Sequence, residues 1–157
     1  MLPPETPLVD DISSQQGVNA DGTGLTALTN ATAAGALSFA PQWSPDGTRV
    51  VFESSRKLDG SDAGNGNGTS NIWRVNADGT GLTALTNATA GFAGSASPQW
   101  SPDGTRVVFE SSRKLDGSDA ANANRMSNIW QVNADGTELT ALTTATAASS
   151  NRPQYSR

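Results

Sequence analysis

Two stretches of the chain are rich in the oxygen-bearing side chains that bind calcium. The first lies at residues 59–67 and its counterpart at residues 116–124. Calcium takes about six to eight oxygen ligands from carboxylates, amides and backbone carbonyls. The candidate ligands are Asp59, Asp62, Asn65, Asn67, Asp116, Asp119, Asn122 and Asn124. Neither stretch has the EF-hand spacing, so a plain polar, flexible loop is the favoured interpretation and a calcium site is the alternative hypothesis.

Catalytic side chains of the commonest kinds are missing. The 157 residues include no cysteine and no histidine, which removes disulfides, thiolate nucleophiles, imidazole bases and the usual zinc ligands. Carboxylates could still act as an acid and base pair, but they recur at matching positions along the chain. Such recurrence fits a structural role better than one asymmetric active site, so we predict that the protein is not an enzyme.

The charge balance is mildly acidic, with 10 basic and 15 acidic residues and a net charge of −5. No basic stripe could neutralise phosphates, so we expect no nucleic-acid binding. No apolar run approaches the roughly 20 residues that span a bilayer, so we expect no membrane insertion. Residues 1–14 lack the basic and apolar regions of a signal peptide. The weakly charged, cysteine-free composition nevertheless favours an exported bacterial protein, in the periplasm or secreted outside the cell.

Long identical segments return at a constant spacing. The stretch PQWSPDGTRVVFESSRKLDGSDA occurs at residues 41–63 and again at 98–120. A second segment, VNADGT, begins at Val18, Val75 and Val132, so the offset is 57 residues both times (75 − 18 and 132 − 75). This spacing indicates a repeat protein whose units bury their apolar faces against one another.

Each repeat carries the signals for four short strands and no helix. In the first full repeat we predict a strand that ends at Trp43 and further strands at residues 49–54, 71–75 and 81–86. The intervening SPDG and NADG segments have the proline, Asp and Gly of tight turns, which gives a structural role to Asp46, Asp78, Asp103 and Asp135. Four antiparallel strands per repeat are typical of a β-propeller blade.

The composite motif WSPDGTRVVFESSR followed by NIWRVNADGTGLTALT resembles the TolB-type, WD-like β-propeller repeat of bacteria. The resemblance covers residues 41–86 and 98–143, and in part 18–30 and 153–157. Propellers of this family include a periplasmic six-bladed domain and domains of peptidases that gate or bind peptides. The repeat here is longer than the roughly 40–45 residues of such blades. Its surplus, at 57–69 and 87–97, is expected to form loops on a single face, where binding sites usually lie.

We predict one repeat domain, 1–157, that is a circularly permuted set of about three blade-equivalents. Residues 1–30 form a partial blade, in which 7–12 is a poor second strand, 39–87 and 96–144 form two blades, and 151–157 is a single strand. Propellers usually need at least about four blades to close, and open strand edges invite pairing with other chains. We therefore expect a homo-oligomer, in which Pro153, Gln154, Tyr155 and Ser156 of one copy complete the N-terminal blade of the next. Two copies would give six blades, and an open arrangement would give a self-assembled filament.

Aromatic and charged side chains that recur in the repeats are assigned structural roles. Blade packing is expected of Trp43, Trp73, Trp100 and Trp130, rather than a sugar-binding cleft. Glu53 with Arg56, and Glu110 with Arg113, are expected to form exposed ion pairs of small energetic consequence.

The favoured function is a non-enzymatic structural or binding protein that self-associates. Its long loops would face an unidentified protein, peptide or glycan, with calcium ordering them in one version of the hypothesis. Two alternatives stay open. The chain could be an engineered or truncated propeller fragment without a ligand of its own, or an accessory propeller domain of a peptidase or carbohydrate-active enzyme.

Overall fold

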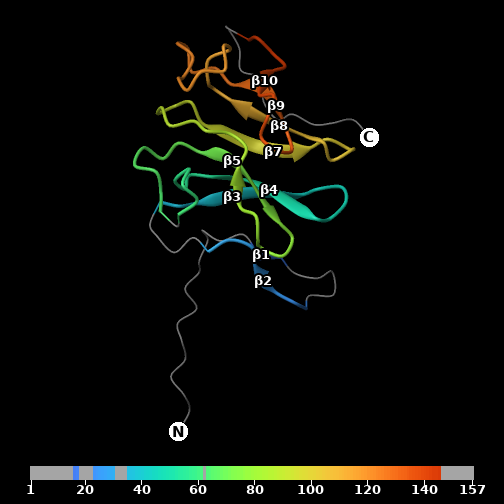
Figure 1. Cartoon of the computed structure of the whole chain (residues 1–157). Coiled ribbons are helices and arrows are strands. Elements are labelled where there is room, and N and C mark those ends of the chain that lie inside the picture. Colours follow the sequence, from blue (N-terminus) through green and yellow to red (C-terminus); the bar gives the residue numbers. More distant parts are fainter. Residues whose placement is uncertain (1–15, 18–22, 31–34, 62, 146–157) are drawn as a thin grey trace.

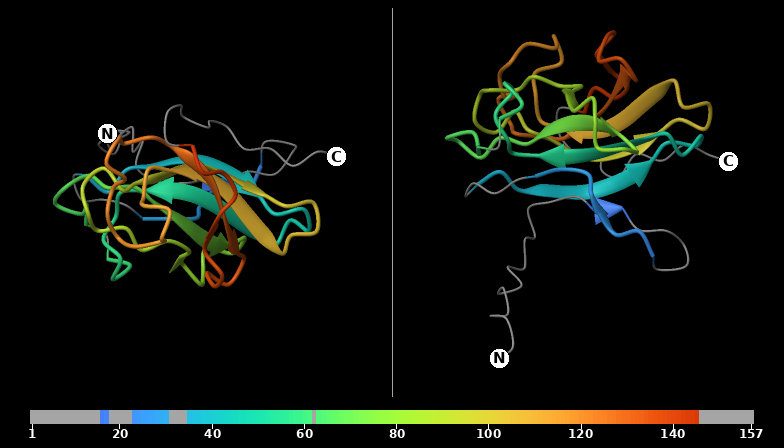
Figure 2. Two further views of the ribbon diagram at one scale, coloured as in Figure 1. Left: turned by 90° about the horizontal axis from the view of Figure 1, so that it is seen from above. Right: turned by 60° about the horizontal axis from the view of Figure 1, so that its bottom comes forward.

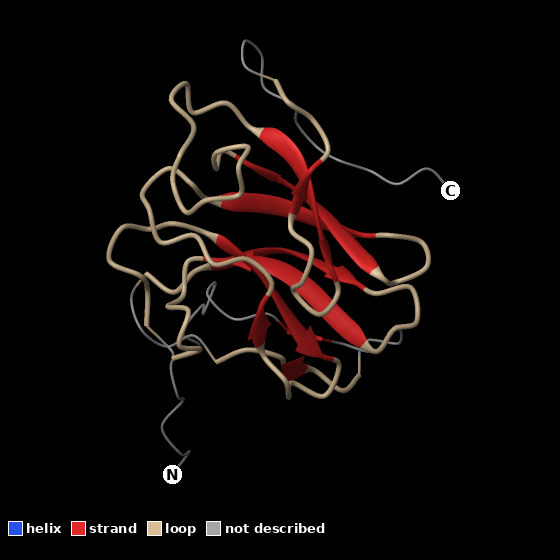
Figure 3. Ribbon diagram, turned by 45° about the horizontal axis from the view of Figure 1, so that its top comes forward, coloured by secondary structure: helices blue, strands red, loops and turns tan. Residues whose placement is uncertain are grey.

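The computed structural model describes residues 16–17, 23–30, 35–61 and 63–145. These residues form strands and loops, and no helix occurs among them (Figure 3). They make one two-stranded sheet and two four-stranded antiparallel sheets, which stack one above another (Figure 1). The predicted all-β fold with four-stranded blades is therefore confirmed. Within the described part of the chain, no helix is long and apolar enough to cross a membrane.

Strand order within each sheet follows the order of the chain. The N-terminal strand pair consists of β1 Gln16–Gly17 and β2 Thr26–Ala27. The first blade consists of β3 Ser38–Trp43, β4 Arg49–Ser54, β5 Asn71–Asn76 and β6 Thr83–Ala84. The second blade consists of β7 Ser95–Trp100, β8 Arg106–Ser111, β9 Asn128–Asn133 and β10 Thr140–Ala141. The second strand spans the residues predicted for it, and the outermost strand is shorter than predicted.

The SPDG turn between β3 and β4 is held by the side chain of Asp46. Its Oδ1 atom accepts hydrogen bonds from the Ser44 hydroxyl at 2.6 Å and from the backbone N–H of Thr48 at 3.0 Å. Gly47 follows with φ of 68°, a backbone conformation that glycine adopts without steric cost. Hydrogen bonds to the carboxylate, led by the Ser44 hydroxyl, lower the pKa of Asp46 to about 2. Asp103 repeats this arrangement in the second blade, and its pKa is also lowered to about 2.

The apolar core lies between the sheets. Successive side chains of each central strand point to opposite faces of its sheet. One face meets the preceding sheet, and the other is directed toward the following one. The core between the two blades includes Val51, Ile72, Leu85, Trp100, Val107, Phe109, Trp130 and Val132. The core between the first blade and the N-terminal strand pair includes Leu28, Val50, Phe52, Trp73 and Val75. Within the described part of the chain, both apolar cores draw their side chains from two neighbouring sheets, which is the dependence that the repeat predicted.

The arginine that follows the second strand of each blade is buried. Arg113 is 0% exposed and lies 5.9 Å from the ring centroid of Trp130, and Arg56 is arranged in the same way over Trp73 at 5.7 Å. The prediction of exposed ion pairs with Glu53 and Glu110 is therefore wrong. After each strand the chain folds back in an isolated bridge, Arg113 with Ala121 in the second blade, and this directs the guanidinium inward onto the indole.

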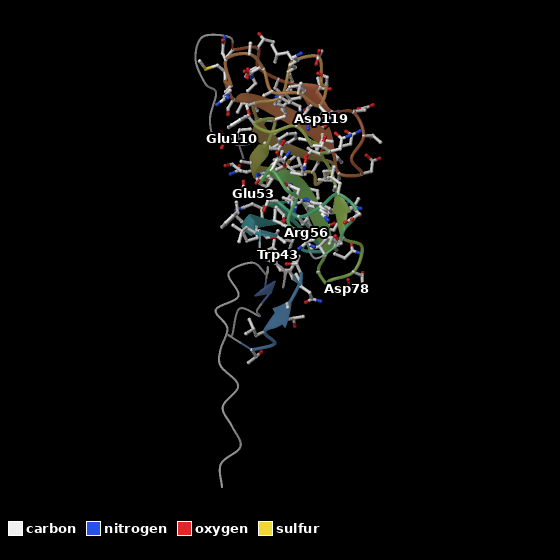
Figure 4. The ribbon with its side chains drawn as sticks, turned by 90° about the vertical axis from the view of Figure 1, so that its left-hand side faces the viewer. Trp43, Glu53, Arg56, Asp78, Glu110 and Asp119 are labelled. Atoms are coloured by element: carbon white, nitrogen blue, oxygen red, sulfur yellow. The ribbon has the colours of Figure 1, made fainter. Side chains whose placement is uncertain are left out.

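The two glutamates instead contact β7, the first strand of the second blade. The backbone N–H of Ser97 donates to Oε2 of Glu53 at 2.8 Å, and its hydroxyl donates to Oε1 of Glu110 at 2.9 Å. Figure 4 shows both glutamates along the same side of the stacked sheets. Burial raises the pKa of Glu53, the Ser97 N–H opposes this shift, and the charge of Glu110 adds to it. Ser97 has a φ of 53° at the bulge in β7, so the bulge places its donors between the blades.

The turn aspartates should make stability depend on pH in the acid range. Both have folded-state pKa values of about 2, below the 3.8 of an unperturbed aspartate. A lowered pKa contributes stability that is present above 3.8 and lost as the pH falls toward 2. In urea unfolding, we expect the double variant Asp46→Asn, Asp103→Asn to be less stable than the parent at pH 6. The gap should shrink below about pH 4 and vanish only below about pH 2, where the carboxyl is protonated in both states. A gap that stays constant across this range would contradict the assignment.

Candidate functional site

The long loops of both blades lie on the same side of the molecule, as predicted. The loop segments at 55–61, 63–70 and 112–127 and the connection at 87–94 appear on the left in Figure 1, and the SPDG turns appear on the right. Figure 2 shows the same separation from two further directions. We call the surface formed by these segments the long-loop face.

The described candidate calcium ligands lie on this face, and most of them accept or donate hydrogen bonds within their own loops. Asp59 Oδ1 accepts from the backbone N–H of Ser61 at 2.8 Å, and Asp116 Oδ1 from that of Ser118 at 2.9 Å. Hydrogen bonds from these serines, led by the hydroxyl groups, lower the pKa of each aspartate. Both carboxylates therefore serve as turn-closing acceptors.

The asparagines close the same loops. Asn65 donates through Nδ2 to the carbonyl of Thr69, and Asn122 donates to that of Met126. Asn67 donates to the carbonyl of Thr89, in the connection between the blades. Asn124 is exposed, and Asp62 lies outside the described residues.

Asp119 links the two blades. Its Oδ1 atom accepts from the backbone N–H groups of Thr89 at 2.7 Å and Ala90 at 3.1 Å, and its Oδ2 atom accepts from the Thr89 hydroxyl. Partial burial works to raise the pKa of Asp119. The three hydrogen bonds and the charge of Arg113 outweigh it, so the pKa is lowered. Asp119 thus ties the loop of the second blade to the connection that leaves the first (Figure 4).

Among the described residues, no three acidic, histidine or cysteine side chains form a group that could hold a metal ion. A calcium site would have to rely on amide and backbone oxygens, or draw carboxylates away from the contacts just described. The calcium hypothesis stays a prediction.

The inner tryptophan of the second blade shows how adjacent blades join. Trp100 is 8% exposed, donates through Nε1 to the carbonyl of Gln42 at 3.1 Å, and lies under the guanidinium of Arg49 at 5.2 Å. Gln42 lies in β3 and Arg49 in β4, which are the first two strands of the preceding blade.

Trp43 is the counterpart of Trp100 but is 52% exposed. The two residues lie in identical 23-residue segments, so their own repeats cannot cause the difference. The neighbour causes it, because the sheet that precedes Trp43 contains only β1 and β2 among the described residues. Figure 4 shows Trp43 at the edge of the first blade nearest this strand pair. The sequence predicted a packing role for Trp43, and the described structure leaves much of its ring uncovered.

The opposite end of the stack has a matching exposed surface. Leu85, on the face of the first blade that meets the second, is 4% exposed, whereas its counterpart Leu142 is 50% exposed. Leu142 was not singled out from the sequence. Aligning the last repeat with the one before it gives the signal, since it pairs Leu142 with Leu85, which faces the next blade. The predicted inter-chain strand, Pro153, Gln154, Tyr155 and Ser156, lies outside the described residues.

Comparison with known proteins bears on the family of the repeat. No family model matches the chain, and no curated protein matches it. Among solved structures, the chain is similar to a putative TolB from Agrobacterium tumefaciens, with a TM-score of 0.58 and 26% identity over 82% of this chain and 40% of that one. It is also similar to TolB from Acinetobacter baumannii, with a TM-score of 0.58 and 17% identity over 83% of this chain and 26% of that one.

A third similar structure is the β-propeller domain of the Trilobed protease from Pyrococcus furiosus, with a TM-score of 0.51 and 15% identity over 80% of this chain and 32% of that one. The chain therefore spans less than half the length of each of these proteins. The likeness to the protease domain shows the fold alone.

The inter-blade contact of Asp119 can be tested by substitution. Replacing Asp119 with Ala leaves the N–H groups of Thr89 and Ala90 without their acceptor and removes a negative charge near Arg113. We expect a loss of about 1 kcal/mol in the free energy of unfolding, reduced from the value for a buried charged acceptor because the site is exposed. Asp59→Ala removes an acceptor within a single loop and should cost less. Equal losses in urea unfolding would contradict the inter-blade role.

A thermal melt tests the calcium hypothesis. Calcium that binds only the folded protein raises the midpoint in proportion to the logarithm of its concentration, and a chelator reverses the rise. That result is expected if the Asp and Asn loops take the ion, and magnesium at the same concentration is the control. A midpoint that is unchanged by calcium and by chelator would leave the hydrogen-bonded polar loop as the correct interpretation.

Proposed function

We propose that the chain is built from TolB-type β-propeller repeats, to which it is similar in structure, and that it is a non-enzymatic structural and binding protein that self-associates by completing blades between copies. The assembly presents the long-loop face to a protein, peptide or glycan. We place it in the periplasm or outside the cell on the basis of its composition.

The exposure of Trp43 is the observation that carries the proposal. Trp100 lies in the same sequence as Trp43, but it is covered by β3 and β4 of the preceding blade. Strand β3 supplies the carbonyl of Gln42 that accepts its hydrogen bond. Gln154 aligns with Gln42 in the terminal segment PQYS. In the proposed contact, the backbone carbonyl of Gln154 in a second copy accepts the hydrogen bond from Nε1 of Trp43. In the sequence alignment, Tyr155 takes the position of Trp43 and Trp100. The proposed contact therefore pairs Tyr155 with Arg106 of its own chain, by analogy with Trp100 and Arg49.

The exposed leucines support the same head-to-tail contact. Leu139 packs against the core that contains Leu85, on the side where the second blade meets the first. Its counterpart in the N-terminal strand pair is Leu25, which is 68% exposed. A second copy that placed Leu25 against the surface around Leu142 would reproduce the inter-blade contact that one chain already contains.

Such a contact uses different surfaces on its two sides, so it closes into a ring or continues as a filament. Three blade-equivalents per copy make a six-bladed ring from two copies, and a different rotation per copy makes the filament. Either form covers the apolar edges that one chain exposes.

The mass of the particle in solution tests the proposal. By light scattering, we expect the unchanged chain to give twice its mass of 16.1 kDa or a longer polymer. Trp43→Ser should weaken association by roughly 30-fold or more, because truncating a central aromatic at an interface costs about 2 kcal/mol or more. Removal of residues 153–157 should also weaken association.

The matched control for Trp43→Ser is Leu115→Ser. Leu115 is an exposed apolar residue on the long-loop face, away from the proposed contact, so this variant should keep the parent mass. An unchanged chain that is a folded monomer at all concentrations would refute blade completion between copies.

A further inference from the structure

The nearly identical repeats differ at three described backbone positions that favour glycine. One, Gly81 against Glu138, follows the NADG turn, and the other two lie on the long-loop face. Gly35 has a φ of 88°, and its counterpart 57 residues later is Phe92, with a φ of 66°. Gly68 has a φ of 67°, and its counterpart is Arg125, with a φ of 53°. A side chain in this left-handed region is disfavoured because its Cβ atom crowds the backbone carbonyl.

The local structure around both pairs is the same, so the substitutions sit on an unchanged framework. The Ser55 hydroxyl donates to the carbonyl of Gly35, and the Ser112 hydroxyl donates to that of Phe92. The backbone N–H of Gly68 donates to the carbonyl of residue 65 at 3.2 Å, and that of Arg125 to the carbonyl of residue 122 at 3.0 Å. Backbone conformations of this kind in residues other than glycine gather at functional sites.

The two strained residues contact each other. The Arg125 guanidinium lies 3.8 Å from the ring centroid of Phe92, although one belongs to the loop of the second blade and the other to the connection between the blades. Phe92 is 62% exposed, and Arg125 is exposed as well. A guanidinium stacked on a ring through its face keeps its N–H edge available for a ligand.

Phe92 and Arg125 border a cavity of about 580 Å³ on the long-loop face. Arg125 is the one charged residue among those that line it, and none of them is a carboxylate. Gly94 lies in the wall, where the previous repeat has Leu37. The hydroxyl of Ser95, also in the wall, is buried and has no hydrogen-bond partner among the described residues. The volume falls within the range of small-molecule sites, about 300–1,000 Å³.

We propose that this cavity binds an organic anion that carries a carboxylate beside an apolar or ring-shaped group. The N–H groups at the edge of the Arg125 guanidinium can donate two parallel hydrogen bonds to a carboxylate. Phe92, with Gly91 and Gly94 of the cavity wall, contacts the rest of the ligand. A peptide C-terminus and an acidic sugar both have this chemistry. The inference deepens the binding half of the proposed function and does not depend on self-association.

Isothermal titration calorimetry on the full chain tests the site with three probes. N-acetyl-leucine and glucuronate each carry a carboxylate, and N-acetyl-leucinamide is the neutral match of the first. We expect one carboxylate probe to bind, and the tighter of the two identifies a peptide or a sugar source. If that probe is N-acetyl-leucine, its amide should bind at least about tenfold more weakly. Absence of binding by both carboxylates would overturn the proposal.

The repeat supplies substitutions that should not disturb the fold. Arg125→Gly and Phe92→Gly each introduce the residue that the previous repeat uses at that position, so the melting midpoint should stay the same or rise. Arg125→Gly should weaken carboxylate binding at least about tenfold. Lys114→Gln removes a positive charge from the same loop, outside the cavity lining, and should leave binding unchanged.

Two results would contradict the role of Arg125. Unchanged affinity in Arg125→Gly would show that the cation does not bind the ligand. A lowered midpoint with unchanged affinity would show that the stacked pair only joins the blades. Light scattering on the same samples separates this proposal from self-association, because a monomer that binds the probe would refute blade completion alone.

Discussion

Burial of apolar side chains between sheets, and never within one sheet, is the constraint on which this structure depends. Each blade has two apolar faces, and it gains stability from every neighbouring sheet that covers one of them. Trp100 shows the complete contact, with its ring covered and its Nε1 atom bonded to the carbonyl of Gln42. Trp43 has the same sequence around it and lacks the same cover. The assembly proposed here follows from that difference.

The two sides of the stacked blades are held together by different kinds of contact. On the side opposite the long-loop face, the SPDG turns are held by aspartates that accept hydrogen bonds from the serine and threonine of their own turn, as Asp46 does. The long-loop face is held by contacts between segments, such as the bonds from Asp119 to the connection at Thr89 and Ala90. A fixed frame with long loops on one side is the usual setting for a binding site. The Phe92 and Arg125 pair lies within that setting.

Sequence patterns predicted the strands because each strand is specified by local turns and by alternation of apolar residues. They could not predict that Arg113 would be buried, since its position over Trp130 depends on how the following loop folds back. Nor could they show that Trp43 would be exposed, because exposure depends on what neighbours a repeat rather than on the repeat itself. Phe92 and Arg125 were not singled out from the sequence, although alignment of the repeats places them where the first repeat has glycine. The φ values and the 3.8 Å contact give those differences a meaning.

The most direct test of the account is the environment of the two inner tryptophans as a function of protein concentration. Fluorine NMR of the chain labelled with 5-fluorotryptophan resolves Trp43 and Trp100 once each is assigned by substitution. The account predicts that the Trp43 signal loses its solvent exposure as concentration rises, while the Trp100 signal stays constant. A Trp43 ring that remains exposed at every concentration would show that no second copy covers it and would contradict the account.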